Sequence, residues 1–298
     1  MNRRQLLQLV LLGALWGASF LFTRISVGEF GPAWLVWARV TAGALFLSGA
    51  AALLRQPLQT KGNTRHFLTL GFLNTALPFL LFAYAATTLN ASLLSIINST
   101  APFWGVIFGI VLTRQPPRKS IFAGLLAGST GVTLLVTGDP SALAAETWQP
   151  VLAAVSAPIC YGLASHYARA RTAHIEPFAA AHGSMWGAVA ISVPVLLTVP
   201  PPIDTNGLQL SAGSLGAALA LGILCTGLAY LIYFRLIREV GAASALTVTF
   251  LIPLFGILWG ALFLGEPVTG GTLLGAAFVL VGTGLVTGVI IPAPLQPR

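Results

Sequence analysis

Long apolar runs alternate with short polar gaps along the whole chain, and each run is about as long as one membrane crossing. A transmembrane helix needs about 20 consecutive, mostly apolar residues. No gap between the runs is long enough to hold a soluble domain. We therefore predict an all-α polytopic membrane protein. Its ten predicted transmembrane helices cover residues 5–27, 32–54, 66–88, 91–112, 120–137, 148–168, 177–199, 212–236, 241–264 and 270–291.

The second half of the chain repeats the first. The fourth apolar run has Pro102 in its interior, and a shift of 151 positions places this proline on Pro253. The same shift places Asn98 on Thr249. Because each half would hold an odd number of helices, the second copy would enter the membrane upside down, as in carriers that alternate access around a midplane site. We predict two inverted five-helix repeats, at residues 1–140 and 141–298.

Charged residues divide between the two sides that ten crossings define. Of the 15 Lys and Arg residues, all but Arg24 and Arg39 lie on the side of the two termini, in the gaps, at helix ends or at the termini themselves. Because Lys and Arg are enriched in cytoplasmic loops, we predict that both termini are cytoplasmic. The opposite gaps contain no Lys or Arg and hold the acidic residues Glu29, Asp139, Glu146, Asp204 and Glu266.

Composition agrees with a membrane protein and excludes several other classes. Charged residues make up 7% of the chain and the mean hydropathy is +0.87, whereas soluble domains carry about 25% charge. The basic residues do not cluster on one soluble face, so we expect no nucleic-acid partner. Cys160 and Cys225 both lie in apolar runs, which argues against a disulfide or a metal site. No nucleotide-binding or metalloprotease motif is present, and we expect neither enzymatic activity nor a cofactor.

Prolines inside the apolar runs mark candidate hinges: Pro78, Pro102 and Pro253. A buried proline leaves the carbonyl four residues earlier without its helical partner, and in lipid that carbonyl must find a partner or line a cavity. The residues that carry these carbonyls are Asn74, Asn98 and Thr249. Their side chains either mend the interrupted helix or offer hydrogen bonds to a substrate, and both alternatives stay open.

Arg39 is the deepest charge, about two turns into the second predicted helix. A charge at that depth needs a carbonyl, a water-filled cavity or an anion, so a structural partner and a substrate carboxylate are both open. The predicted helices contain no Asp or Glu in their interiors, which argues against carboxylate-coupled antiport. Aromatic residues in the same interiors either pack against neighbours or wall a cavity for an amphipathic solute. The aromatic candidates are Trp16, Phe79, Trp104, Tyr161, Tyr230 and Tyr233.

Several segments resemble the drug/metabolite transporter superfamily, specifically its ten-helix EamA-type exporters, and the resemblance covers nearly the whole chain. They are LWGASF at 15–20, the pattern of Pro32 with Arg39, the helices of Pro102 and Pro253, and LGEPVTGGTLLGAAFVLVGT at 264–283. The resemblance implies a cavity among helices one to four and six to nine, with helices five and ten outside as scaffold. The chain departs from the pattern where Thr113-Arg114-Gln115 replaces Gly-Glu, and where Ser184 takes the place equivalent to Arg39.

The resemblance implies an inner-membrane, multi-pass exporter of small metabolites, including amino acids. The aromatic candidates favour aromatic or other neutral amino acids. A multidrug or other metabolite exporter of the same superfamily is the alternative, and a lipid flippase, a membrane enzyme or a receptor-like protein would need groups or loops that are scarce here. The expected partners are a small-molecule substrate and membrane lipid, with the chain a monomer or a weak homodimer.

Overall fold

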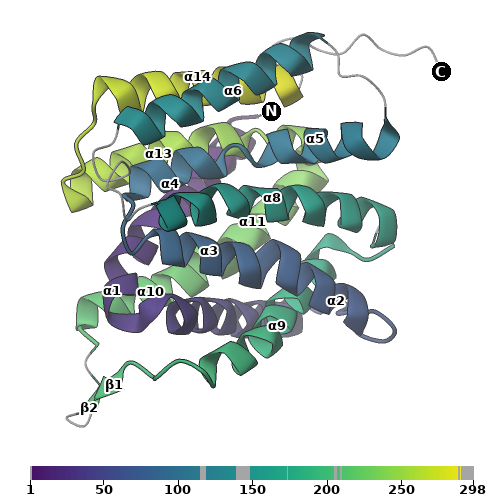
Figure 1. The fold of residues 1–298 in the computed structure, drawn as a ribbon. Helices are drawn as coiled ribbons and strands as arrows, with labels where there is room; N and C mark the ends of the chain where they lie inside the picture. The colour runs from purple at the N-terminus through teal and green to yellow at the C-terminus, as the bar shows by residue number, and fades with distance from the viewer. Residues whose placement is uncertain are drawn as a thin grey trace.

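The computed structural model describes residues 2–114, 119–138, 148–172, 174–204, 207–208, 210–287 and 289. Over this range the regular structure is helical, apart from an antiparallel ribbon of β1 (Ile203–Asp204) and β2 (Gly207–Leu208). Eight helical segments in the described residues are long and apolar enough to cross a membrane, and one further apolar helix is shorter. The chain is therefore a polytopic helical membrane protein, with many of its helices running side by side (Figure 1). The count of ten crossings stays a prediction.

The first two predicted helices are joined in one element, α1 (Arg3–Leu54), which bends at Gly31. Gly31 has φ 68° and ψ 157°, a backbone conformation that glycine adopts readily and other residues do not. Pro32 follows and can begin a helix, because the first turn needs no N–H donor there. At about 1.5 Å per residue, an unbroken helix of 52 residues would be far longer than a bilayer is thick. The bend at Gly31 therefore separates two limbs of α1.

Two segments contain a π-helical turn at the same position of the repeat. The first runs through α2 (Thr64–Gly71), η1 (Phe72–Ala76) and α3 (Leu77–Ala85), and the second through α10 (Ala212–Gly222), η2 (Ile223–Leu228) and α11 (Ala229–Val240). Pro78 follows η1 after one intervening residue and has no N–H to donate. The N–H of Leu77 bonds to the carbonyl of Phe72, five residues back. Ala229 occupies the place of Pro78 in the second half, so the second π-turn forms without a proline.

The predicted proline breaks differ between the halves. Between α4 (Ala91–Asn98) and α5 (Ala101–Thr113) the helix is interrupted directly before Pro102, as predicted. In the second half the interruption lies at Leu246 and Thr247, between α12 (Ala242–Ala245) and α13 (Val248–Leu264). Pro253 lies inside α13, so the prediction of a break there is wrong. The N–H groups of Thr249 and Phe250 instead bond three residues back, which places the irregular turn before the proline.

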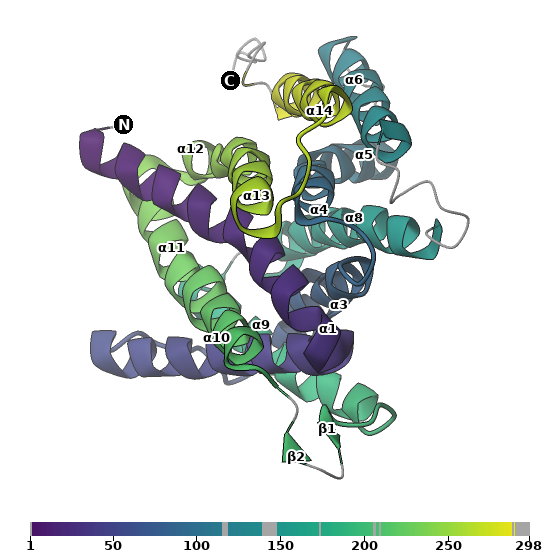
Figure 2. The ribbon, with the colours of Figure 1, turned by 90° about the vertical axis from the view of Figure 1, so that its left-hand side faces the viewer.

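The helices α6 (Lys119–Gly138) and α14 (Gly270–Thr287) pack against each other at one side of the molecule (Figures 1 and 2). A Cβ atom added to Gly131 would lie 2.7 Å from the carbonyl oxygen of Gly275, so only small residues allow this approach. From α14, the buried hydroxyl of Thr283 donates to the carbonyl of Ser99, at the break between α4 and α5. This arrangement fits the expected scaffold role of the pair.

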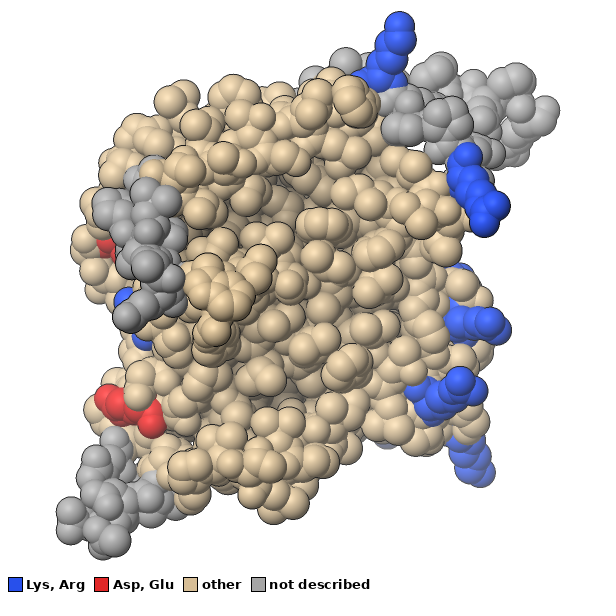
Figure 3. All heavy atoms as spheres, viewed as in Figure 1, with Lys and Arg blue, Asp and Glu red and all other residues tan. Residues whose placement is uncertain are grey.

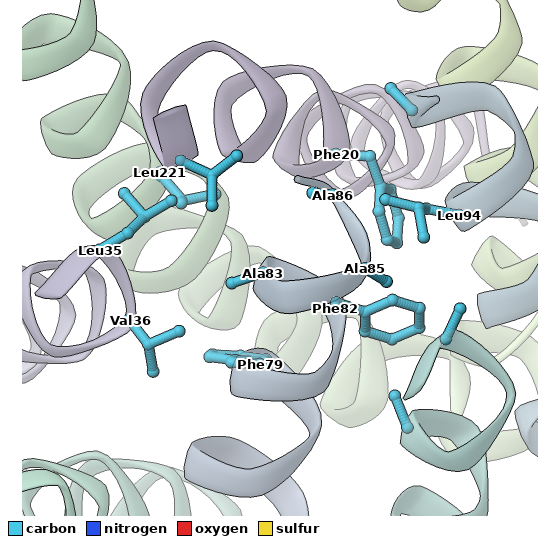
Figure 4. Packing of buried hydrophobic residues seen from close by; sticks show 14 of the residues in the cluster. Phe20, Leu35, Val36, Phe79, Phe82, Ala83, Ala85, Ala86, Leu94 and Leu221 are labelled. Carbon is cyan, nitrogen blue, oxygen red and sulfur yellow. The ribbon is translucent and has the colours of Figure 1, made fainter. Parts of the chain in front are cut away.

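The remaining long helices are α8 (Trp148–Arg171) and α9 (Pro177–Leu196). The main apolar core lies where α3 meets helices of both halves, and Figure 4 shows side chains from α1, α3, α4 and α10 gathered there. Phe20 and Phe82 meet edge to face with ring centroids 5.4 Å apart. The core therefore ties the two halves together around α3.

Charge is distributed unevenly between the two ends of the helices. In Figure 3 the Lys and Arg side chains gather mainly at the right-hand end, and the visible acidic side chains lie at the left-hand end. We call these the basic end and the acidic end, the latter holding Glu29 and Glu266. Which end faces the cytoplasm stays a prediction. Several charged residues of this argument lie outside the described residues: Arg118, Asp139, Glu146 and Arg298.

Candidate functional site

A cavity of about 290 Å³ lies in the interior, between helices of both halves. This volume is close to the lower limit of about 300–1,000 Å³ that is usual for small-molecule pockets. Nine of the ten predicted binding residues line it: Trp16, Arg39, Asn74, Phe79, Asn98, Tyr161, Tyr230, Tyr233 and Thr249. The structure thus brings together residues that are spread over more than 230 positions of the sequence.

Trp104 is the candidate that does not line this cavity. It lies on α5, where α5 crosses α8 at Gly162: a Cβ atom added to this glycine would come within 2.7 Å of the Cβ of Trp104. Trp104 is therefore part of a close helix–helix contact. Depth in an apolar run suggested a cavity position, but depth does not show which face of the helix a side chain occupies.

Arg39 lies over an aromatic ring and has no carboxylate partner among the described residues. Its Cζ atom is 3.6 Å from the centroid of the Phe79 ring, within the range of a cation–π interaction. Its Nε donates to Thr226 Oγ1 at 3.1 Å, and in the described part of the chain the terminal nitrogens make no hydrogen bond to protein. An ion pair among the described residues joins Arg235 and Glu239, whose side chains are partly exposed on α11, away from Arg39. The terminal nitrogens of Arg39, which form the fork of its guanidinium group, therefore have N–H donors left for a ligand in the cavity.

Aromatic rings form part of the cavity wall. The Trp16 ring lies 5.2 Å from Tyr233 and 6.4 Å from Tyr230, measured between centroids. Tyr230 stacks on Phe234 at 5.6 Å, which supports the wall from behind. Such edge-to-face and offset contacts are the arrangements that aromatic rings prefer. The cavity therefore combines the Arg39 cation with a wall of aromatic rings.

The amides and the threonine that precede the prolines do not share one role. The Asn74 side chain lies beside the Tyr230 hydroxyl. The Asn98 amide, at the end of α4, makes no hydrogen bond to the other described residues and lines the cavity. The Thr249 hydroxyl donates to the Leu246 carbonyl at 2.9 Å. Asn98 is thus free to meet a ligand, whereas Thr249 serves the irregular start of α13.

Eight further residues line the cavity that were not proposed as binding residues: Ser19, Phe20, Thr23, Phe82, Ala101, Cys225, Leu246 and Ile252. The repeat could have found two of them, because a shift of 151 positions relates Asn74 to Cys225 and Phe82 to Tyr233. Ala101 and Ile252 are equivalent to each other, and neither was proposed. Helical spacing from Trp16 leads to Ser19, Phe20 and Thr23, since residues three, four and seven apart share a helix face. Leu246 has no such signal, because the turn that exposes it was not predicted.

At the acidic end, two carboxylates connect one half of the chain to the other. Glu266, before α14, accepts hydrogen bonds from the N–H groups of Ala91 and Ser92 at 2.6 and 2.9 Å and from the Ser92 hydroxyl at 2.6 Å. Glu29 accepts from the N–H and hydroxyl of Ser211 at 2.7 and 2.8 Å. Each carboxylate lies at a helix N-terminus, where negative charge is favoured. We call these contacts the Glu266 latch and the Glu29 latch.

The fold and the cavity define a polytopic membrane protein of the carrier type, with a central solute-sized space and no metal-binding group of His, Cys, Asp or Glu among the described residues. The chain belongs to the EamA-like transporter family, whose model matches residues 4–137 and 148–288. This membership confirms the resemblance to that family and the assignment as a membrane transporter, and it is consistent with a protein that is not an enzyme.

Individual relatives are distant but cover most of the chain. An uncharacterized transporter of Archaeoglobus fulgidus is 26% identical over 309 residues, which is 96% of this chain and 98% of the relative. Protein PecM of Dickeya dadantii is 25% identical over 237 residues, or 78% of this chain and 76% of PecM. One solved crystal structure superposes with a TM-score of 0.67 at 19% identity, covering 97% of this chain and 98% of the other. That likeness shows the fold alone.

Proposed function

We propose that this chain is a secondary transporter that exports aromatic or other neutral amino acids across the cell inner membrane. Family membership supports a small-molecule carrier in a membrane. The proposal adds the solute class, the direction and the membrane. It also includes ten crossings with both termini cytoplasmic, and two inverted repeats at 1–140 and 141–298 that enclose the cavity. Alternating access around a site between such repeats needs no nucleotide hydrolysis.

The observation that carries the proposal is the Arg39 fork, which faces the cavity without a protein carboxylate among the described residues. A charge at membrane depth costs about 2.5–3.5 kcal/mol on insertion scales, and a substrate carboxylate would offset that cost. Arg binds a carboxylate through two parallel N–H···O bonds. In this binding mode the carboxylate of an amino acid lies at Arg39, its ring lies against Trp16 and Tyr230, and its ammonium group faces the Asn98 amide oxygen.

Movement in this proposal occurs at interruptions of the helices. Pro78 and Pro102 lie at a π-turn and a helix break, and the second half has its π-turn at η2 and its break before α13. Non-helical backbone at membrane depth is tolerated where it lines a cavity. Pro253 remains a candidate hinge within α13. The two latches would open when the cavity becomes accessible from the acidic end.

Transport by the purified protein in liposomes tests the proposal. Vesicles are loaded with labelled phenylalanine or with phenethylamine, which is phenylalanine without its carboxylate, and efflux is followed with and without a pH gradient. We expect saturable efflux of phenylalanine in preference to phenethylamine. In Arg39→Gln, kcat/KM for phenylalanine should fall at least tenfold, which is about 1.4 kcal/mol. Arg65→Gln, on an exposed surface, is the matched control and should transport normally.

Other outcomes would contradict the proposal in distinct ways. Equal efflux of both solutes would exclude recognition of the carboxylate and favour a multidrug or amine exporter. Absence of saturable efflux for every amino acid would end the amino-acid assignment. Movement of labelled phospholipid between leaflets, in place of solute efflux, would favour a flippase.

A further inference from the structure

The Thr226 hydroxyl holds Arg39 by one nitrogen. Its oxygen accepts from Arg39 Nε at 3.1 Å, and its proton goes to the Leu221 carbonyl oxygen at 3.0 Å. A hydroxyl has a single proton to donate, so the bond to Leu221 fixes Thr226 as an acceptor toward Arg39. Thr226 is fully buried, which removes water as a competing partner.

The π-turn η2 and two close helix contacts set the position of this hydroxyl. Thr226 lies in η2, and its acceptor Leu221 is five residues back. A Cβ atom added to Gly222 would lie 2.9 Å from the Arg39 carbonyl oxygen, and one added to Gly43 would lie 2.8 Å from Thr226 Cγ2. The second limb of α1 therefore rests directly on η2, which brings the Arg39 side chain to Thr226.

Two contacts together determine which edge of the guanidinium faces the cavity. Thr226 takes Nε, and the Phe79 ring lies under the flat face. The remaining edge carries the two terminal nitrogens, whose parallel N–H bonds match the spacing of a carboxylate. A guanidinium that could rotate about its stem would lose this orientation, because only one edge would satisfy both oxygens of the ligand.

We propose that Thr226 is a positioning residue that sets the selectivity of the cavity for solutes with a carboxylate. The inference rests on the proposed function, because it assumes that Arg39 meets the substrate. Thr226 does not touch the solute. It keeps Nε occupied, so that the terminal nitrogens of Arg39 are presented to the cavity.

The other half of the chain provides an internal control. Thr75 lies 151 positions before Thr226, in η1, and is also fully buried. Its hydroxyl oxygen has no hydrogen-bond partner among the described residues. The position equivalent to Arg39 holds Ser184, which is too short to reach as far as an arginine. The same hydroxyl therefore occurs twice, and only Thr226 has a cation to orient.

The experiment compares Thr226→Val, Thr226→Ser and Thr75→Val for efflux of phenylalanine and phenethylamine. Valine keeps the shape of threonine and removes its hydroxyl. We expect Thr226→Val to raise KM for phenylalanine about tenfold with little change in kcat, and to leave phenethylamine unaffected. Thr226→Ser should restore the wild-type preference, and Thr75→Val should retain it. If Thr226→Val fails to fold, Thr226→Ala lacks the same hydroxyl and replaces it.

The results separate this inference from the proposed function. If the wild type exports both solutes equally, the proposed function fails before any variant is made, and the inference fails with it. If the wild type prefers phenylalanine and Thr226→Val keeps that preference, only the positioning role is wrong. A loss of the same size for both solutes in Thr226→Val would likewise overturn it, since a general packing defect does not distinguish a carboxylate.

Discussion

Asn74 and Cys225 occupy the same position in two π-helical turns, one in each half of the chain, and both line the cavity. The same holds for Phe79 and Tyr230, on the helices that follow. The backbone geometry is therefore repeated while the side chains differ. Aromatic character is kept across the repeat, whereas an amide is exchanged for a thiol. The comparison indicates that the shape of the cavity comes from both halves, whereas its charged side chain and its amides come from the first.

The close helix–helix contact beside each π-turn shows most clearly how the two halves differ. A Cβ atom added to Gly222 would lie 2.9 Å from the Arg39 carbonyl oxygen, and one added to Gly71 would lie 2.8 Å from that of Ser184. The backbones thus approach each other equally closely at the two helix contacts. Arg39 reaches the cavity, whereas Ser184 is buried and bonds to the Ala181 carbonyl of its own helix. One helix contact thus places a cation in the cavity, and the other is a packing contact.

The largest expected effect comes from an arginine at the second helix contact. Ser184→Arg would place a charge at a buried, closely packed position, at a cost of about 3 kcal/mol at membrane depth. We expect a strongly lowered melting temperature of the purified protein, or failure to accumulate in the membrane. Ser184→Ala, which loses one hydrogen bond to its own helix, should change stability by only about 1 kcal/mol. A stable Ser184→Arg protein that gains affinity for carboxylates would show that the halves are interchangeable after all.

The two latches offer a second comparison, because each joins a carboxylate of one half to a helix N-terminus of the other. Glu266→Gln would weaken three hydrogen bonds in a partly buried contact. Bonds to charged groups contribute about 1.5–3 kcal/mol, so we expect the population open at the acidic end to rise about tenfold. The measurement is the rate at which an impermeant maleimide labels Thr23→Cys in a protein without its native cysteines.

Controls for the latch experiment come from the same molecule. Glu29→Gln should increase labelling less than Glu266→Gln, because its contact is exposed to solvent. Glu239→Gln removes an exposed pair with Arg235 and should leave the rate unchanged. Equal labelling in all three variants and the parent would mean that the carboxylates do not hold the acidic end closed.

Substitutions of Asn98 and Thr249 are expected to have smaller effects, one on KM and the other on the melting temperature. Asn98→Ala should raise KM for phenylalanine about fivefold without lowering the melting temperature, since one hydrogen bond contributes about 1 kcal/mol and the amide has no partner among the described residues. Thr249→Val should lower the melting temperature slightly and leave KM nearly unchanged, because its hydroxyl bonds to Leu246. Efflux kinetics and thermal unfolding on both variants measure the difference. The reverse pattern would assign the ligand contact to the second half.

The sequence predicted the helices and most of the lining because both follow from simple periodicities. Apolar runs of bilayer length fix the helices, and the offset of 151 positions relates the lining of one half to that of the other. The π-turns could not be predicted, because the proline that accompanies η1 has no counterpart at Ala229. The break at Leu246 and Thr247 was missed for a related reason: the irregular turn lies ahead of Pro253, at residues that carry no breaking signal.

An apolar run also does not predict which face of its helix lines the cavity. Trp16 and Trp104 lie at similar depth in their runs, yet only Trp16 lines the cavity. In soluble helices polar residues mark the outer face, but in a membrane-spanning helix both the lipid face and the packed face are apolar. The repeat relates Trp16 to Tyr161, at an offset of 145, and Trp104 to Phe255, at an offset of 151, so an aromatic partner alone does not mark a cavity position. Tyr161 lines the cavity, whereas Phe255 lies at a close helix contact with Gly17, as Trp104 does with Gly162.

The smallest effect is expected for Trp104, and it tests this distinction directly. Trp104→Phe keeps an aromatic side chain at the contact with Gly162 and should leave KM for phenylalanine within about twofold of wild type, whereas Trp16→Phe, at the cavity wall, should raise it severalfold. The reason is that Trp16 lines the cavity beside Tyr230 and Tyr233, while Trp104 faces α8. Efflux kinetics on the two variants give the comparison. A larger rise in KM for Trp104→Phe than for Trp16→Phe would move the binding site toward α5 and away from the cavity described above.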